Sequence, residues 1–111
     1  MRYLTVPVPV RLWLPVDGCV DNSMSIDVVD GIMESVIAGS CVRDAGWRAA
    51  AAFEGEPDGF GWPPRDHRLA ITLRREHWEW VVSQLRRWEP FETEAAVTQA
   101  RELIEAALAA V

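Results

Sequence analysis

The residues best suited to binding a metal are two cysteines and two histidines, because thiolates and imidazoles are the ligands that zinc prefers. They are Cys19, Cys41, His67 and His77. Structural zinc sites usually contain close pairs with C-x-x-C or H-x-x-x-H spacing, and neither spacing occurs in this sequence. We therefore expect no metal and no cofactor, and we expect both cysteines to be buried free thiols.

The residues that could act as nucleophiles or bind phosphate lack the surrounding pattern that such chemistry needs. The sequence contains no G-x-S-x-G elbow and no P-loop. The glycines in the segment 59–62 lack the third glycine and the following helix of a dinucleotide site. The acids between residues 17 and 30 do not have the alternating spacing of an EF-hand. The sequence predicts no catalytic residues and favours a protein that is not an enzyme.

Tryptophan is the most unusual feature of the composition, with six residues in a chain of 111. A core of this size needs fewer, and on a helix over 75–88 the side chain of Trp80 lies opposite the apolar stripe of that helix. Exposed aromatic side chains are favoured anchors at protein interfaces. The alternative, that these rings fold back onto the core, stays open. The candidates for an interaction surface are Trp13, Phe60, Trp62, His77, Trp80 and Gln84.

The charge balance argues against nucleic acid and anionic membranes as partners. The net charge is −6 and the pI is about 4.8, whereas nucleic-acid-binding proteins usually present a concentrated basic face. Every basic residue is an arginine apart from the two histidines, and the region 65–88 is locally positive. No apolar run approaches the roughly 20 residues that a membrane span requires. We expect a cytoplasmic protein with a protein partner, no direct nucleic-acid binding and no membrane association.

The N-terminal segment 3–14 has the two-residue period of a strand with one buried face, from Leu4 onward. Its prolines, Pro7 and Pro9 among them, fall on odd positions, so the missing N–H donors share one edge. That arrangement predicts a strand at the edge of a sheet.

The next segments predict a mixture of helices and strands. Apolar residues from Val28 to Ile37 have helical spacing and predict a helix over 25–38. Residues 41–54 have both an alanine-rich helical composition and an alternating apolar pattern, and we favour a strand because 67–73 offers a pairing partner. Glycines and prolines make 55–66 a long loop. Two further helices are predicted over 75–88 and from a Thr93 cap to the chain end.

These elements predict a single α+β domain over residues 1–111, in the order β-α-β-β-α-α, with about three strands packed against three helices. If 41–54 is helical instead, two strands remain and the protein is mostly α.

Two functions of different classes fit this composition. The first is a small acidic protein-binding or inhibitory protein that acts through exposed aromatic and acidic residues. Immunity proteins, antitoxins and phage inhibitors share this composition, but no motif links the chain to any of these families. The alternative is a small-molecule binding domain or enzyme subunit with a tryptophan-lined pocket. Homodimerisation through the alanine-containing C-terminal helix is also left open.

Overall fold

The computed structural model describes residues 2–58 and 60–111. Over these residues the chain forms four α-helices, one short 3-10 helix and a two-stranded antiparallel sheet. The elements in order are β1 (Tyr3–Pro9), α1 (Val10–Val29), α2 (Met33–Ala51), β2 (Arg68–Arg74), α3 (Arg75–Trp88), η1 (Glu89–Phe91) and α4 (Ala96–Ala109). The predicted α+β class is confirmed. The predicted third strand is wrong, because residues 41–51 belong to α2.

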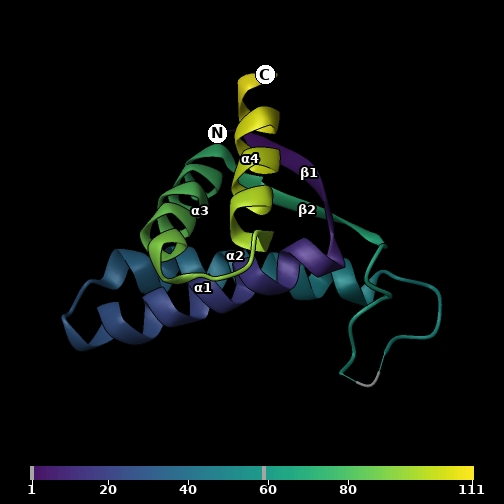
Figure 1. The fold of residues 1–111 in the computed structure, drawn as a ribbon, viewed down its shortest axis with the longest axis horizontal. Helices are drawn as coiled ribbons and strands as arrows, with labels where there is room; N and C mark the ends of the chain where they lie inside the picture. The colour runs from purple at the N-terminus through teal and green to yellow at the C-terminus, as the bar shows by residue number, and fades with distance from the viewer. Residues whose placement is uncertain (1, 59) are drawn as a thin grey trace.

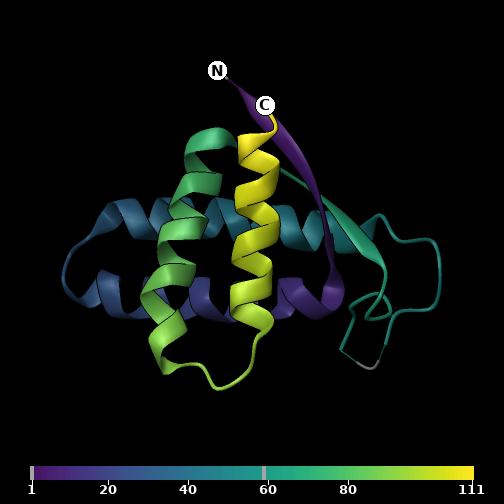
Figure 2. The same cartoon turned by 45° about the horizontal axis from the view of Figure 1, so that its top comes forward.

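Helices α1 and α2 form a long antiparallel hairpin that lies along the longest axis of the molecule (Figure 1). Helices α3 and α4 lie side by side and cross this hairpin, as Figure 2 shows from a second direction. Strand β1 runs beside α4, and β2 packs against α2. The α1–α2 turn and the loop 52–67 therefore lie at opposite ends of the longest axis (Figures 1 and 2).

The sheet has one buried face and one exposed face. Val6 and Val8 of β1 and Ile71 of β2 point into the core, and the alternate residues from Tyr3 to Pro7 and from Arg68 to Thr72 are exposed. The N–H of Val10 donates to the carbonyl of His67 at 2.9 Å, so the even residues of β1 direct their N–H groups toward β2. The nitrogen of Pro7 therefore faces away from β2, and the predicted edge position is confirmed.

The predicted strand over 3–14 is too long, because β1 ends at Pro9 and α1 begins at Val10. The apolar residues after Pro9 satisfy two periods at once. Alternate positions suit a strand, but the buried residues Trp13, Val16 and Val20 have the three- and four-residue spacing of a helix face. Tertiary packing selects the helix and turns the indole of Trp13 inward.

Residues 41–51 are helical because their small residues pack closely against α1. Ala38, Val42, Gly46 and Ala50 recur every four residues on the buried face of α2. A Cβ at Gly46 would lie 2.3 Å from Nε1 of Trp13, which shows how closely the α2 backbone approaches that indole. The strand-like alternation in this segment is therefore incidental.

The predicted helix over 25–38 is also wrong, because the chain reverses in its middle. Residues up to Val29 belong to α1, and α2 begins at Met33. Gly31 has a φ of +74°, a conformation that side chains with a Cβ rarely adopt. The predicted stripe is thus split between two helices and does not form a buried face.

The centre of the core contains two of the tryptophans. The rings of Trp13 and Trp78 meet edge to face at a centroid distance of 6.4 Å, a favoured arrangement for aromatic pairs. The Nε1 of Trp78 donates to the carbonyl of Leu4 at 2.8 Å, which fixes α3 against β1. Both rings are fully buried, so they stabilise the fold and are closed to a partner.

Candidate functional site: the exposed end of the helical hairpin

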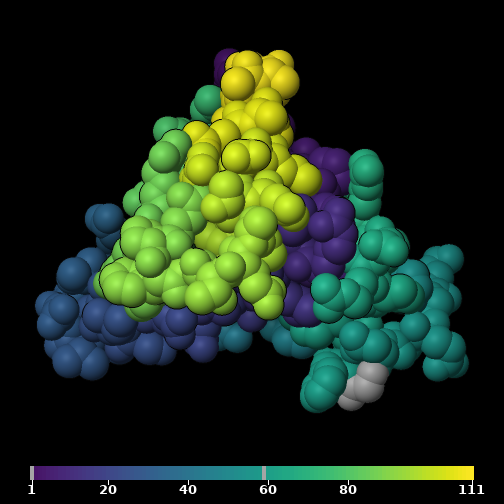
Figure 3. All heavy atoms as spheres, in the orientation of Figure 1, coloured from purple at the N-terminus to yellow at the C-terminus, as the bar shows by residue number. Residues whose placement is uncertain are grey.

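Six exposed apolar side chains lie between residues 26 and 37, at the end of α1, in the turn and at the start of α2, and we call this set the apolar cap. Its members are Ile26, Val28, Val29, Ile32, Met33 and Ile37. Val29 is 83% exposed. Scattered exposed aliphatic residues are normal on protein surfaces, but a group gathered at one place is typical of an interaction site. Figure 3 shows this end of the hairpin projecting past α3 at the left of the view.

The part of the α1–α2 hairpin that carries the apolar cap contains acidic residues and no basic residue. The sequence from Leu12 to Val42 contains no Arg, Lys or His. Two of its acids, Asp17 and Asp21, are paired with Arg43 farther along the hairpin. Asp30 and Glu34 lie beside the cap and form no ion pair with any residue in 2–58 or 60–111. Their uncompensated negative charge would attract a basic surface.

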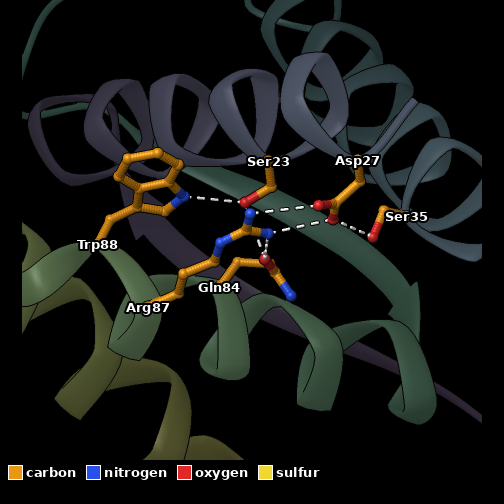
Figure 4. A network of polar contacts seen from close by, with 6 residues as sticks. All are labelled: Ser23, Asp27, Ser35, Gln84, Arg87 and Trp88. Carbon is orange, nitrogen blue, oxygen red and sulfur yellow. Dashed lines mark hydrogen bonds and ion pairs between the residues drawn. The ribbon is translucent and has the colours of Figure 1, made fainter. Parts of the chain in front are cut away.

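A polar network beneath the cap fixes the hairpin against α3 (Figure 4). The guanidinium of Arg87 donates to both carboxylate oxygens of Asp27, at 3.1 and 3.2 Å, and the hydroxyl of Ser35 donates to the same carboxylate at 2.6 Å. The hydrogen bonds from Arg87 and then Ser35 hold the pKa of Asp27 below its ordinary value. The buried carboxylate therefore stays charged and connects α1, α2 and α3.

The same network includes Gln84, one of the residues predicted for the interaction surface. The side-chain oxygen of Gln84 accepts a hydrogen bond from Ser23 at 2.8 Å, and the Nε1 of Trp88 donates to Ser23 at 2.9 Å (Figure 4). Gln84 is buried, so its amide cannot meet a partner without unpacking α3. Its prediction as an exposed contact residue is wrong, and its position explains why: it faces α1 across the helix interface.

In the loop after α2 the ring of Phe60 is exposed and that of Trp62 is buried. The indole of Trp62 stacks on Trp47 at 4.2 Å, and its backbone is bound to Asp58 at both N–H and carbonyl. Trp62 is therefore buried as an anchor of the loop and is not the exposed contact we predicted. Phe60 is 88% exposed, as a contact residue requires.

Of the remaining predicted site residues, Trp13 is buried in the core, and His77 and Trp80 are half-buried at its edge. Trp13 is fully buried, so its prediction as a surface residue is wrong, and the cause is the early start of α1. Its Nε1 is the one buried side-chain donor without an acceptor among the described residues. Trp80 and His77 are half-buried on α3, and Trp80 packs against the edge of the core. The structure does not bring the six predicted residues together into one surface.

An open groove of about 720 Å³ lies between the outer face of α2 and the exposed face of the sheet. Ile37, Cys41 and Ala45 line it from α2, and Tyr3 and His77 line it from the other side. None of the residues that line it is a tryptophan.

The potential zinc ligands are not assembled into a site. Among the residues that the structure describes, no group of three or more His, Cys, Asp or Glu side chains is placed to hold a metal ion. Both cysteines are free. Cys19 is buried, and burial raises its pKa to about 11, whereas Cys41 is exposed, contrary to our expectation.

The sequence did contain a signal for the apolar cap. Asp30-Gly31 is a turn-forming dipeptide, and it lies between two pairs of aliphatic residues. Interpreting it as a reversal would have placed Val29 and Ile32 on a connection, where aliphatic side chains have fewer neighbours to cover them.

Comparisons with family models, curated proteins and solved structures found no match to this chain. Within residues 2–58 and 60–111, no helix has both the length and the apolar character needed to cross a membrane.

Proposed function

We propose that this protein is a small acidic protein-binding or inhibitory protein that docks onto another protein through the apolar cap. The observation that carries the proposal is the group of six exposed aliphatic side chains at the projecting end of the hairpin. Covering such a patch releases water from apolar surface at roughly 25 cal/mol per Å², which is a general driving force for association.

Charge determines the kind of partner that suits the apolar cap. Asp30 and Glu34 beside the cap would favour an apolar cleft bordered by arginine or lysine, and the net charge of −6 would speed the encounter with a basic protein. A nucleic-acid partner would be repelled by the same charges. The action is then that of an inhibitor or immunity-type protein working in the cytoplasm, where both thiols stay reduced.

The exposed ring of Phe60 provides a second contact point for the same function. It lies on the loop at the other end of the longest axis, so one compact partner domain would not cover both it and the apolar cap on one copy (Figure 1). The cap has six aliphatic residues and the loop apex has one exposed ring, so we expect the cap to dominate the affinity.

The alternative function, small-molecule binding, is supported by the groove between α2 and the sheet. The sequence suggested a ligand pocket lined by tryptophans, but no tryptophan lines this groove. The aliphatic surface of the cap favours a protein partner over a small ligand.

The test is affinity capture from the cells that make the protein. We expect Val29→Glu to reduce recovery of the partner at least about tenfold, because it places an acid in the middle of the apolar contact. Val111→Glu is the matched control, since it makes the same change at an exposed valine far from the cap (69% exposed).

Thermal unfolding should confirm that both variants are folded. Equal recovery of the partner with wild type and with the double variant Val29→Glu, Ile32→Glu would exclude the cap as the binding surface. Loss of recovery with Phe60→Ala alone would instead assign binding to the loop.

A further inference from the structure

The outer face of α2 is exposed in its N-terminal half, and in its C-terminal half it borders the groove beside the sheet, where Ala45 and Ala49 are half-buried. Ala38, Val42 and Gly46 on the adjoining face pack into the molecule. Met33 and Ile37 on the outer face are 55% and 62% exposed, and Cys41 is exposed as well. Ile37, Cys41 and Ala45 of this face line the groove beside the sheet, so the face borders an open concave surface.

The side chains on this face are ordered by size along the helix. The N-terminal half has the large residues Met33 and Ile37, and the C-terminal half has the small residues Ala45 and Ala49. Two such helices packed antiparallel, with Cys41 at the centre, would place Ile37 against Ala45 of a second copy, because the two positions are equally far from residue 41. Met33 would meet Ala49 of the second copy for the same reason. Large side chains thus meet small ones at each step, which is the arrangement that close helix packing requires.

The charges on this face are ordered in the same way. Glu34 and Arg48 are also equally far from residue 41, so the antiparallel arrangement places each Glu34 opposite Arg48 of the other copy. Arg48 donates to Asp44 of its own helix at 2.7 Å and is 81% exposed, so its guanidinium can donate to a second carboxylate as well. A parallel arrangement would instead place like charges side by side, which is destabilising.

We propose that two copies of this protein pair through the outer faces of α2, antiparallel, around a two-fold axis at Cys41. A two-fold axis makes the contact self-complementary, since each pair of residues occurs twice. The dimer covers Met33, Glu34 and Ile37 and leaves Val28, Val29 and Ile32 of each cap exposed, so it goes beyond the proposed binding function, and a partner would contact the part of the cap that stays exposed.

The register also changes what a partner would meet. Residue 30 of one copy lies opposite residue 52 of the other, so the cap of each copy stands beside the loop that holds Phe60 in its neighbour. The two exposed apolar features that are far apart in one copy (Figure 1) become adjacent in the dimer.

Sedimentation velocity over a range of concentrations measures the dimer directly, and charge reversal tests its register. We expect Glu34→Arg and Arg48→Glu each to raise the dissociation constant of the dimer about tenfold, because each places two like-charged pairs in the contact. The double variant restores opposite charges across the axis, and its dissociation constant should return to within about threefold of wild type.

Oxidative crosslinking tests the position of the axis. Copper phenanthroline removes two protons and two electrons from a pair of thiols, and it joins them only where the sulfurs can approach bonding distance. We expect a covalent dimer of the wild-type protein on a non-reducing gel and none for Cys41→Ser. Cys19 is buried and has a raised pKa, so it should not form the link.

Two results would overturn the proposal. One is a protein that sediments as a monomer at every concentration. The other is a dimer whose dissociation constant is unchanged by Glu34→Arg and Arg48→Glu. A dimer weakened by Ala106→Glu on α4 and by neither of those variants would assign pairing to the C-terminal helix. Val29→Glu should leave the dimer intact, so loss of partner binding and loss of dimerisation are measured by different variants.

Discussion

Replacing Gly46 with alanine should lower the free energy of unfolding by about 2 kcal/mol, although alanine favours helices by about 1 kcal/mol over glycine. The added Cβ would lie 2.3 Å from Nε1 and 2.8 Å from Cε2 of Trp13. That indole is fully buried and packed against Trp78, so it has no space to move into. Urea denaturation followed by tryptophan fluorescence measures the change.

The matched control is Gly18→Ala, because Gly18 lies inside α1 and the added Cβ would have no atom within 4 Å apart from its chain neighbours and the nearby backbone of its own helix. This variant should gain up to about 1 kcal/mol from helix propensity alone. Gly39→Ala should fall between the two, since its Cβ would meet the flexible side chain of Met24, which can rotate aside. If Gly18→Ala and Gly46→Ala change stability equally, the close approach of α2 to Trp13 is not a constraint on the fold.

Replacing Arg87 with leucine should cost about 2 kcal/mol of stability at neutral pH. The change leaves the carboxylate of Asp27 charged and nearly buried, with Ser35 as its remaining donor. Arg87 is itself 36% exposed, so water moderates the penalty. Arg86→Leu is the control, because Arg86 pairs with Glu105 on the surface and such pairs contribute at most about 1 kcal/mol.

The pH dependence of this effect follows from the lowered pKa of Asp27. A carboxyl group whose pKa is lower in the folded protein contributes stability above its ordinary value of 3.8, and that contribution is lost as the pH falls through the folded pKa. The difference between wild type and Arg87→Leu should therefore be full at pH 7 and shrink in strong acid. Urea titrations between pH 7 and pH 2 measure it. A difference that stays constant with pH would mean that the Asp27 charge is not the cause.

The sequence predicted the elements whose residues have one unambiguous period. Helix α3 appears at its predicted bounds because Trp78, Val81 and Leu85 have helical spacing and no alternation. Strand β1 was predicted at a sheet edge, since Pro7 and Pro9 share a parity and leave their missing N–H donors on one side. The prediction was wrong where two periods coincide, after Pro9 and in residues 41–51, because only packing against another element selects between them.

The candidate site was harder to predict for a related reason. Val29 and Met33 were expected on the apolar stripe of one helix, whereas Trp13, Trp62 and Trp80 were candidates for the surface. The structure reverses both assignments for Trp13 and for the cap. A hydropathy pattern identifies which residues prefer to be buried, but it does not show whether any other element is available to cover them.

The pairing of β1 with β2 has a consequence for the order of events during synthesis. β1 is made first, yet its partner follows only after both hairpin helices and the long loop. Until then, an alternating aliphatic segment has a free backbone edge on each side, which is a hazard for association with other unfinished chains. Pro7 and Pro9 remove N–H donors from one of those edges. The prolines therefore protect the nascent chain at the stage when it has nothing else to pair with.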